Sequence, residues 1–279
     1  MKFRSLLEPL YEQNLLRQCH SIPRHIAIIQ DGNRRFARMI GMNKADGHRA
    51  GADKTEEMLD WAREIGIRYI TLYSFSTENF SRDQQEVSEL FSLFKEKFTR
   101  VLDDDRVHRY HIRVQMVGER SRLPPDLLAA IDAAEKATAS YHDYYLNVAL
   151  AYGGRNEIVR AIQQILEEIR SGTCTPGEID SALVERHLNG GIELPPVDLI
   201  IRTGNECRTS NFLPWLANGH ESAVYFCAPY WPMFRKIDLL RAVRVYSQRV
   251  VSRTYTGPGD SRVVTGSDLT GLSSESPDS

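Results

Sequence analysis

The segment from Ile26 to Gly41, IAIIQDGNRRFARMIG, places an acidic residue and two arginines directly after an apolar run. The run Ile26–Ile29 is typical of a buried strand, and Asp31 follows it closely. Arg34 and Arg35 can each bind phosphate oxygens through two parallel hydrogen bonds. A carboxylate among phosphate ligands would repel the anion unless it held a divalent cation. The pattern therefore predicts a magnesium diphosphate site; the competing interpretation is an Asp-Gly turn leading into a solvated basic helix.

The two residues after Asp31 suit the beginning of a helix beside such a ligand. Gly32 permits a tight turn and a close approach of the backbone. Asn33 can cap a helix, whose first N–H groups would then point toward the same anion. We therefore expect the carboxylate and both arginines to lie at one helix start.

Later segments carry side chains of the same kind where a predicted strand ends or a predicted helix begins. They are GHRAG at 47–51, TLYSFSTENFSR at 71–82 and IRTGNECRTSNF at 201–212. The last of these has Arg202 and Arg208 on either side of a glycine turn, and Glu221, just before another apolar run, is a second candidate metal ligand. Each segment alone also fits a solvated polar loop. Together they favour a diphosphate site built from several junctions.

Apolar runs typical of strands alternate with helical patterns along the chain. Strands are predicted at 26–29, 69–73, 112–117, 146–151, 197–201 and 224–226, and helices at about 47–65, 86–105, 124–139, 154–170, 178–188 and 236–251. This alternation predicts an α/β fold with a mostly parallel sheet covered by helices. Ligands of such sheets bind beyond the carboxyl ends of the strands, where the polar segments fall.

The composition is that of an ordinary globular protein. Of 279 residues, 42% are hydrophobic and 26% charged, and the formal net charge of −2 does not indicate nucleic-acid binding. The four cysteines have no CxxC spacing, which favours reduced thiols over a structural zinc site. No apolar run reaches the length of about 18 residues that a spanning helix needs. We therefore expect a cytoplasmic protein.

The two ends of the chain differ from its body. Residues 1–23 are predicted to form an amphipathic helix that packs on the body or on a partner. From Thr254 onward the chain is rich in glycine, serine and aspartate. We expect one catalytic domain at 24–253 and a disordered polar tail at 254–279.

The chain resembles the cis-prenyltransferases of the undecaprenyl diphosphate synthase family. The matching stretches are HIAIIQDGNRRFAR, DGHRAG, TLYSFSTENFSR, LNVALAYGGRNEI, VDLIIRTGNECRTSNFLPW and YFCAPYWPMF, in order from about residue 24 to 250. The LLRQ leader and the NFLPW and YFCAPYWP stretches are closer to archaeal members than to bacterial ones.

The resemblance implies a homodimer whose subunits have a parallel six-stranded sheet and an apolar tunnel between the sheet and its helices. Asp31 would bind Mg²⁺ together with Glu221 and assist departure of the allylic diphosphate. Asn79 would accept the proton lost from isopentenyl diphosphate, a role that a diphosphate oxygen could also fill. The implied substrate-binding residues are Gly32, Asn33, Arg34, Arg35, Phe36, Lys44 and His48 for the allylic substrate, Ser76, Thr77, Glu78, Phe80 and Arg82 in the cleft, and Arg202, Arg208, Thr209 and Ser210 for isopentenyl diphosphate.

The implied reaction condenses isopentenyl diphosphate with farnesyl or geranylgeranyl diphosphate and yields a polyprenyl diphosphate for lipid glycosyl carriers. The tail would grow inside the tunnel until it meets the floor. Leu146 matches the floor region of the family, and it is equally well explained as a core residue. Because the product is a lipid, we also expect peripheral contact with a membrane.

Departures from the family pattern leave two alternatives open. Asn205 replaces the second glycine of RTGG, and Cys207 stands where bacterial members often have histidine. Both fall in the isopentenyl segment, so one alternative is a relaxed or different acceptor, such as an alcohol or a glycerol-type hydroxyl. The other is a subunit of a heteromeric prenyltransferase. The presence of Asp31, Arg202 and Arg208 favours an active catalytic subunit.

Smaller departures are Gln30 for the usual methionine before DGN and Lys44 for an arginine. The polar Gln30 is predicted to hydrogen-bond the turn. Other enzyme classes fit less well. The run Asp103–Asp105 lacks the DDxxD spacing of the all-α trans-prenyltransferases, and no GxxxxGK[ST] phosphate loop occurs.

Overall fold

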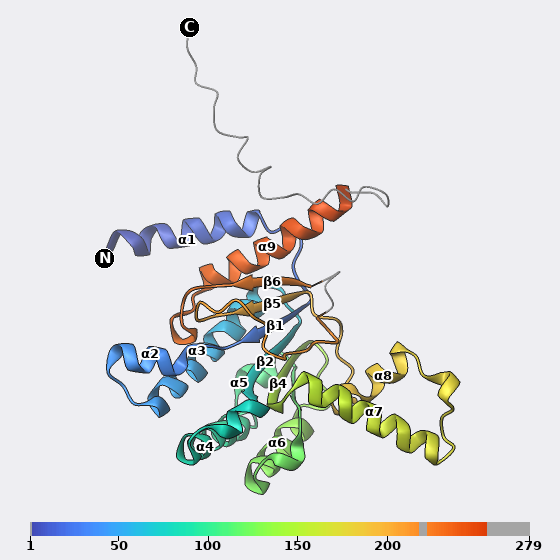
Figure 1. The fold of residues 1–279 in the computed structure, drawn as a ribbon. Helices are drawn as coiled ribbons and strands as arrows, with labels where there is room; N and C mark the ends of the chain where they lie inside the picture. Colours follow the sequence, from blue (N-terminus) through green and yellow to red (C-terminus); the bar gives the residue numbers. More distant parts are fainter. Residues whose placement is uncertain (1, 218–221, 256–279) are drawn as a thin grey trace.

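Six parallel strands form the central sheet, in the order β3-β4-β2-β1-β5-β6 (Figure 1). A computed structural model describes residues 2–217 and 222–255, with side chains for 8–217 and 222–250. The strands are β1 His25–Ile29, β2 Tyr69–Ser76, β3 Ile112–Val117, β4 Tyr144–Tyr152, β5 Leu199–Arg202 and β6 Ala223–Phe226. Every pairing is parallel. The predicted fold class is confirmed.

Nine α-helices and several 3₁₀ turns connect the strands of the described chain. The helices are α1 Lys2–Arg17, α2 Asn33–Ile40, α3 Lys44–Ile65, α4 Gln84–Arg100, α5 Asp105–Arg109, α6 Pro125–Ala137, α7 Gly154–Arg170, α8 Ser181–His187 and α9 Lys236–Tyr255. The single helix predicted at 86–105 is two helices, because Asp104 accepts a hydrogen bond from the backbone N–H of Arg106 and caps a new start. No described helix has the length and apolar character needed to cross a membrane.

Helix α9 continues through Tyr255, two residues into the segment 254–279 that the sequence predicts as a polar tail. The rest of the predicted tail, from residue 256, lies outside the described residues. At the other end, α1 packs along α9, where its Leu15 is buried against Ile237 and Leu240.

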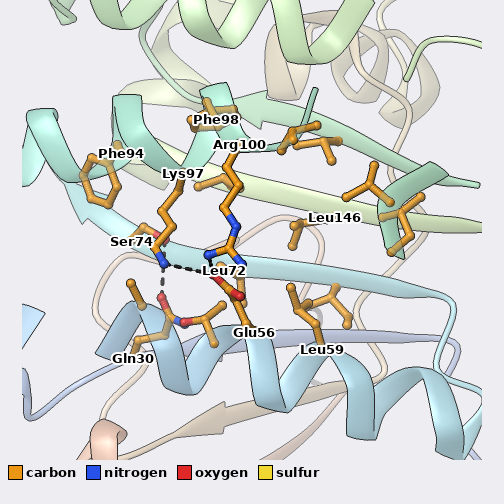
Figure 2. A pocket seen from close by; sticks show the side chains of 18 of the residues that line it. Gln30, Glu56, Leu59, Leu72, Ser74, Phe94, Lys97, Phe98, Arg100 and Leu146 are labelled. Atoms are coloured by element: carbon orange, nitrogen blue, oxygen red, sulfur yellow. Dashed lines mark hydrogen bonds and ion pairs between the residues drawn. The ribbon is translucent and has the colours of Figure 1, made fainter. Parts of the chain in front are cut away.

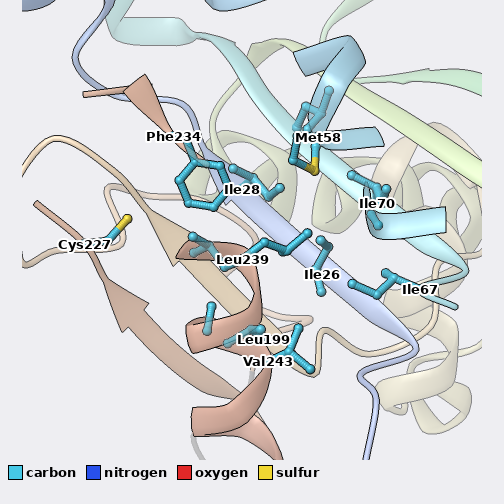
Figure 3. Close-up of a cluster of buried hydrophobic side chains, with 14 of the residues drawn as sticks. Ile26, Ile28, Met58, Ile67, Ile70, Leu199, Cys227, Phe234, Leu239 and Val243 are labelled. Atoms are coloured by element: carbon cyan, nitrogen blue, oxygen red, sulfur yellow. The ribbon is translucent and has the colours of Figure 1, made fainter. Parts of the chain in front are cut away.

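Strand β1 lies at the centre of the core, and all five of its residues are buried. Figure 3 shows Ile26 and Ile28 on one face of the sheet, packed with side chains of α3 and α9 such as Met58. Ala27 and Ile29 pack on the opposite face, in a cluster that includes Phe212 and Leu213 of the segment after β5. A strand buried on both faces has no polar side to alternate, which explains the uninterrupted apolar run in the sequence.

Three buried polar side chains, on β1, β2 and β4, form a hydrogen-bonded row across the sheet. His25 Nδ1 lies 2.8 Å from the carbonyl oxygen of Pro195, and Nε2 lies 2.8 Å from the hydroxyl of Thr71. Asn147 donates to the same hydroxyl at 3.2 Å. The network fixes a neutral imidazole that donates from Nδ1 and accepts at Nε2. Burial lowers the pKa of His25 from 6.5 to about 4.

We expect the stability of the protein to fall as the pH decreases from about 6.5 to about 4. In this range the unfolded chain protonates His25 and the folded chain does not, so the proton favours unfolding. The penalty is about 2 kcal/mol near pH 4.5. Urea unfolding at neutral and acidic pH measures it, and the variant His25→Gln should lose that part of the pH dependence. An equally steep dependence in the variant would contradict the assignment.

Candidate functional site

Most of the predicted site residues meet at the carboxyl ends of β1, β2 and β5. Asp31 follows β1, the segment Ser76–Arg82 follows β2, and Arg202 ends β5. These strands are neighbours in the sheet, and parallel strands end at the same edge. Segments far apart in the sequence therefore converge on one place, as expected for an open α/β sheet.

The carboxylate of Asp31 lies between two guanidinium groups. Arg35 donates to Oδ1 at 3.0 Å, and Arg202 donates to Oδ2 at 2.9 Å. The backbone carbonyl of Asp31 accepts from the Thr203 hydroxyl and from the N–H of Trp231. The side chain of Asp31 is still 28% exposed. It is thus fixed in position and accessible to a ligand.

Arg202 is the most deeply buried cation of the group, with only 4% of its side chain exposed. Its Nη1 donates to the backbone carbonyl of Arg208 at 2.7 Å and to the hydroxyl of Ser210. Its Nε is buried without a hydrogen-bond partner among the described residues. A buried guanidinium needs compensating acceptors, so Arg202 holds the loop after β5 in place.

The loop after β5 carries the other residues predicted for isopentenyl diphosphate. Arg208 is exposed and donates from Nε to Ser210 at 3.2 Å, while Thr209 is exposed beside it. Glu206 forms ion pairs with both Arg35 and Arg208. Glu221, the second predicted metal ligand, lies outside the described residues.

Gly32 and Gly204 are needed because the backbone of the site is tightly packed. A Cβ on Gly32, which has φ +115°, would lie 2.8 Å from the Tyr230 side chain. A Cβ on Gly204 would lie 2.6 Å from the Arg35 guanidinium. Gly32 therefore makes room for Tyr230, whose ring centre lies 5.3 Å from the guanidinium carbon of Arg35.

Two local predictions about the helix starts are wrong. Gly32, not Asn33, occupies the cap position of α2, and Asn33 is the first helical residue. The segment GHRAG does not open a helix, because α3 already begins at Lys44 after the cap residue Asn43. Gly47 lies inside α3, where a Cβ would approach Ala37 of α2 to 2.7 Å. Its small size allows the two helices to pack closely.

A second cluster of basic residues surrounds Glu86, which the sequence analysis did not identify. Its carboxylate lies 3.2 Å from Arg82, 3.3 Å from Lys44, 3.4 Å from His48 and 3.9 Å from Arg34. The Glu86 side chain is only 4% exposed. Burial alone would raise its pKa, but the surrounding cations hold the pKa of Glu86 below its usual value. Glu86 thus gathers four residues that the sequence predicts to bind substrate.

The segment after β2 is a short 3₁₀ helix, Thr77–Ser81, closed by its own side chains. The amide oxygen of Asn79 accepts a hydrogen bond from the N–H of Ser76 at 3.1 Å. The ring of Phe80 packs edge-on against Phe75. The guanidinium carbon of Arg122 lies over the Phe80 ring, 3.9 Å from its centre. The Asn79 amide and the Phe80 ring therefore already have protein partners.

Asn211 is a further residue that sequence reasoning missed. Its side-chain oxygen accepts a hydrogen bond from the backbone N–H of Arg155. Its backbone carbonyl accepts one from the backbone N–H of Gly154, at the start of α7. Its amide nitrogen approaches Glu78 at 3.4 Å. The backbone of Asn211 is left-handed, with φ +60°. One residue thus connects the loop after β5, the start of α7 and the segment after β2.

An apolar cavity of about 230 Å³ extends from this site between the sheet and helices α3 and α4. Gln30, Asn33 and His48 line it near the site. Gln30 donates to Thr55 at 2.7 Å and accepts from Ser74, so it bonds α3 and β2 rather than its own turn. Phe36 and Phe80 are not among the lining residues.

Figure 2 shows the wall of this cavity, formed by Leu72 and Leu146 of the sheet and by Leu59 and Phe94 of the helices. Leu146 therefore faces the cavity as well as packing in the core. Glu56 of α3 joins α4 by ion pairs, including one of 2.9 Å to Lys97. The expected apolar tunnel is confirmed.

The family of the chain follows from comparison with known proteins. The family model described as "Putative undecaprenyl diphosphate synthase" matches residues 29–254. The chain belongs to the undecaprenyl diphosphate synthase family. It is therefore a cis-prenyltransferase, an enzyme that makes polyprenyl diphosphates.

Curated members of this family from archaea are similar over most of their length. A protein of Methanosarcina mazei is 49% identical over 243 residues, which are 86% of this chain and 82% of that protein. A protein of Archaeoglobus fulgidus is 48% identical over 246 residues, which are 88% of this chain and 97% of that protein. Both are named "Tritrans,polycis-undecaprenyl-diphosphate synthase (geranylgeranyl-diphosphate specific)".

Solved cis-prenyltransferase structures share the fold. Lavandulyl diphosphate synthase from Lavandula x intermedia, in complex with dimethylallyl diphosphate, aligns with a TM-score of 0.73 and 31% identity over 81% of this chain and 95% of that chain. A probable undecaprenyl diphosphate synthase from Campylobacter jejuni aligns with a TM-score of 0.63 and 24% identity over 85% and 97%. The second comparison supports the fold alone.

We expect the variant Glu86→Gln to lower the pKa of His48. Burial already lowers this pKa, and the hydrogen bond and negative charge of Glu86 offset part of that effect. Without the charge, the imidazolium loses its stabilising partner while Arg34 and Arg82 stay close. An NMR titration of the imidazole signals would measure the shift, with His48→Gln identifying the resonance. A raised or unchanged pKa would show that Glu86 does not stabilise the charged form.

Proposed function

We propose that this cis-prenyltransferase condenses isopentenyl diphosphate with geranylgeranyl diphosphate, and that the product serves as a lipid carrier of glycosyl groups. The supporting observation is that one set of arginines contacts Asp31 and a second set of basic residues surrounds Glu86, beside an apolar cavity that His48 lines. Two diphosphates need two sets of cations, and a growing isoprenoid tail needs an apolar space. The choice of starter rests on the names of the archaeal relatives. Farnesyl diphosphate is the other starter predicted from the sequence.

The cluster around Glu86 is proposed to bind the allylic diphosphate. Arg34, Lys44 and Arg82 carry more positive charge than the single carboxylate can neutralise, and His48 lies beside them as a further hydrogen-bonding group. An arriving diphosphate therefore meets donors that are already oriented, which lowers the cost of binding. Gly32, Asn33, Arg35 and Phe36 complete this proposed subsite, and its position beside the cavity would let the tail enter.

The cluster around Arg202 is proposed to bind isopentenyl diphosphate. Arg208, Thr209 and Ser210 lie on the same loop, and the exposed Arg208 would exchange its ion pair with Glu206 for one with an anion. Ser76, Thr77, Glu78 and Phe80 are proposed to line the cleft between the two substrates. Asn211 connects this cleft to the loop, so the two subsites share one support.

A magnesium ion fits the site only together with substrate. Among the described residues, no group of three or more His, Cys, Asp or Glu side chains is arranged to hold a metal. Asp31 offers one carboxylate, and Mg²⁺ commonly takes one or two carboxylates plus phosphate oxygens and water. Asp31, with Glu221 as the second predicted ligand, would hold the ion, which would neutralise charge on the departing diphosphate.

In the proposed reaction, the bond between the allylic carbon C1 and its diphosphate oxygen breaks. The arginines stabilise the charge that develops on the leaving group. The double bond of isopentenyl diphosphate forms the new carbon–carbon bond to C1, and a proton is then lost. A diphosphate oxygen is the better acceptor, because the Asn79 amide is a weak base whose oxygen already accepts the N–H of Ser76.

The assembly and setting of the enzyme are part of the proposal. We propose a homodimer in the cytoplasm that contacts the membrane peripherally, where its lipid product is used. An alcohol or glycerol-type acceptor and a heteromeric partner subunit are the alternatives, both predicted from the sequence.

An assay with labelled isopentenyl diphosphate and a panel of allylic diphosphates tests the proposed function. We expect a ladder of polyprenyl diphosphates, longest with geranylgeranyl diphosphate and absent when EDTA is added. Parallel reactions with an alcohol acceptor test the first alternative. No incorporation with any starter would contradict the proposed reaction for the chain on its own and point to a partner subunit.

We expect the variant Asp31→Ala to lower kcat/KM by about 10³-fold, because the site loses a metal ligand and the partner of two arginines. The fold should survive, since Arg202 keeps its bonds to the loop after β5. The matched control is Asp103→Ala, which removes an exposed carboxylate on the turn between α4 and α5. Normal turnover of the Asp31 variant, with both variants folded by circular dichroism, would contradict the role of Asp31.

A further inference from the structure

The turn between α2 and α3 exposes a patch of large apolar side chains. Met39 is 55% exposed, Ile40 48% and Met42 44%. Single exposed apolar residues are common, but three within four positions at the tip of a turn are not explained by the core. Met233, also exposed, lies on the short 3₁₀ turn that contacts α2. We call Met39, Ile40 and Met42 the apolar tip.

The backbone of the apolar tip is held in one conformation. Gly41 has φ +75° and donates to the carbonyl of Arg38, and Met42 donates to that of Ala37 at 2.9 Å. These two bonds form a Schellman motif that ends α2. The tip therefore presents its side chains without a large cost in conformational entropy when it meets a partner.

Basic residues flank the apolar tip in the sequence. Residues 34–49 include five arginines and lysines and only one acidic residue, Asp46. Arg38 is exposed, and no ion-pair partner for it occurs among the described side chains. The other four basic residues form ion pairs, so within the described part of the chain Arg38 is the free cation beside the apolar side chains. An exposed apolar cluster with an adjacent unpaired arginine fits the surface of an anionic bilayer.

A second exposed apolar stripe shows that exposure alone does not select this partner. Val159, Ile162 and Leu166 of α7 are exposed to a similar extent. However, residues 154–170 include three arginines and three glutamates, so their charges balance. In Figure 1, α7 lies on the opposite side of the sheet from α2.

We propose that the apolar tip inserts into the surface of an anionic lipid bilayer and brings the site to the membrane. This inference rests on the proposed function, because a substrate and a product with long isoprenoid tails belong to the lipid phase. Helix α2 begins directly after Asp31 and Gly32 and has eight residues, so the tip lies about 12 Å along the helix from the site. A tail would then cross little water between bilayer and cavity.

Vesicle flotation with the full-length protein tests the proposal. The protein should bind vesicles of phosphatidylcholine mixed with phosphatidylglycerol more tightly than vesicles of phosphatidylcholine alone. The variant M39Q/I40Q/M42Q should lower the partition coefficient at least about tenfold. The variant R38Q should lower it about fivefold, only for anionic vesicles and only at low salt.

The matched control is V159Q/I162Q/L166Q, which replaces the same number of exposed apolar side chains on α7. It should bind vesicles like the unaltered protein. Equal binding by the apolar-tip variant, or no binding of the unaltered protein to either vesicle, would overturn the inference. A lower mass of the apolar-tip variant in light scattering would also overturn it, by assigning the patch to a protein contact.

Transfer from the water-soluble geranyl diphosphate, without vesicles, separates this inference from the proposed function. The apolar-tip variant should retain that activity, since none of its changed residues belongs to the proposed site. If the unaltered protein transfers prenyl groups but does not bind vesicles, the membrane-binding inference is refuted and the proposed reaction is not. If the unaltered protein binds vesicles but transfers from no starter, the proposed reaction is refuted and the membrane-binding inference is not.

Discussion

The contact between Asp31 and Arg202 joins the ends of two strands that are far apart in the sequence. Arg202 is buried, so its charge must be compensated by nearby acceptors, and Asp31 and the loop after β5 supply them. Removing Asp31 would leave the buried Arg202 with only the neutral acceptors of that loop. The turn after β1 and the loop after β5 are thereby fixed relative to each other, and the rest of the site is arranged around this pair.

Glu86 likewise compensates opposite charges, those of the basic residues in the second cluster. Arg34 of α2, Lys44 of α3 and Arg82 of the turn before α4 would repel each other if brought together without an acid. A buried carboxylate lets them gather before any diphosphate arrives. The enzyme therefore uses acidic residues in two ways. Asp31 is accessible and able to take part in the chemistry, whereas Glu86 is enclosed and keeps the basic residues in position.

The cavity and the charged site are built from opposite kinds of surface that meet at Gln30. Its side chain bonds α3 and β2 where the polar junctions end and the apolar wall begins. Such a boundary suits a substrate with a charged head and an apolar tail. It also explains why a polar residue is tolerated at the end of an otherwise apolar strand.

The sequence by itself determined the alternation of strands and helices, and with it the parallel sheet and the convergence of Asp31, Ser76 and Arg202 on one edge. These features depend on local periodicity and on a general property of parallel sheets. Only the tertiary structure decided the contacts of Glu86 with Lys44 and His48, the contacts of Asn211 with Glu78 and Arg155, and the contact of Phe80 with Arg122. Each joins residues that the sequence separates by tens of positions, and the packing of the elements sets those distances. Short-range patterns report which face of a helix is apolar, but they carry no information on which charged residues it meets there.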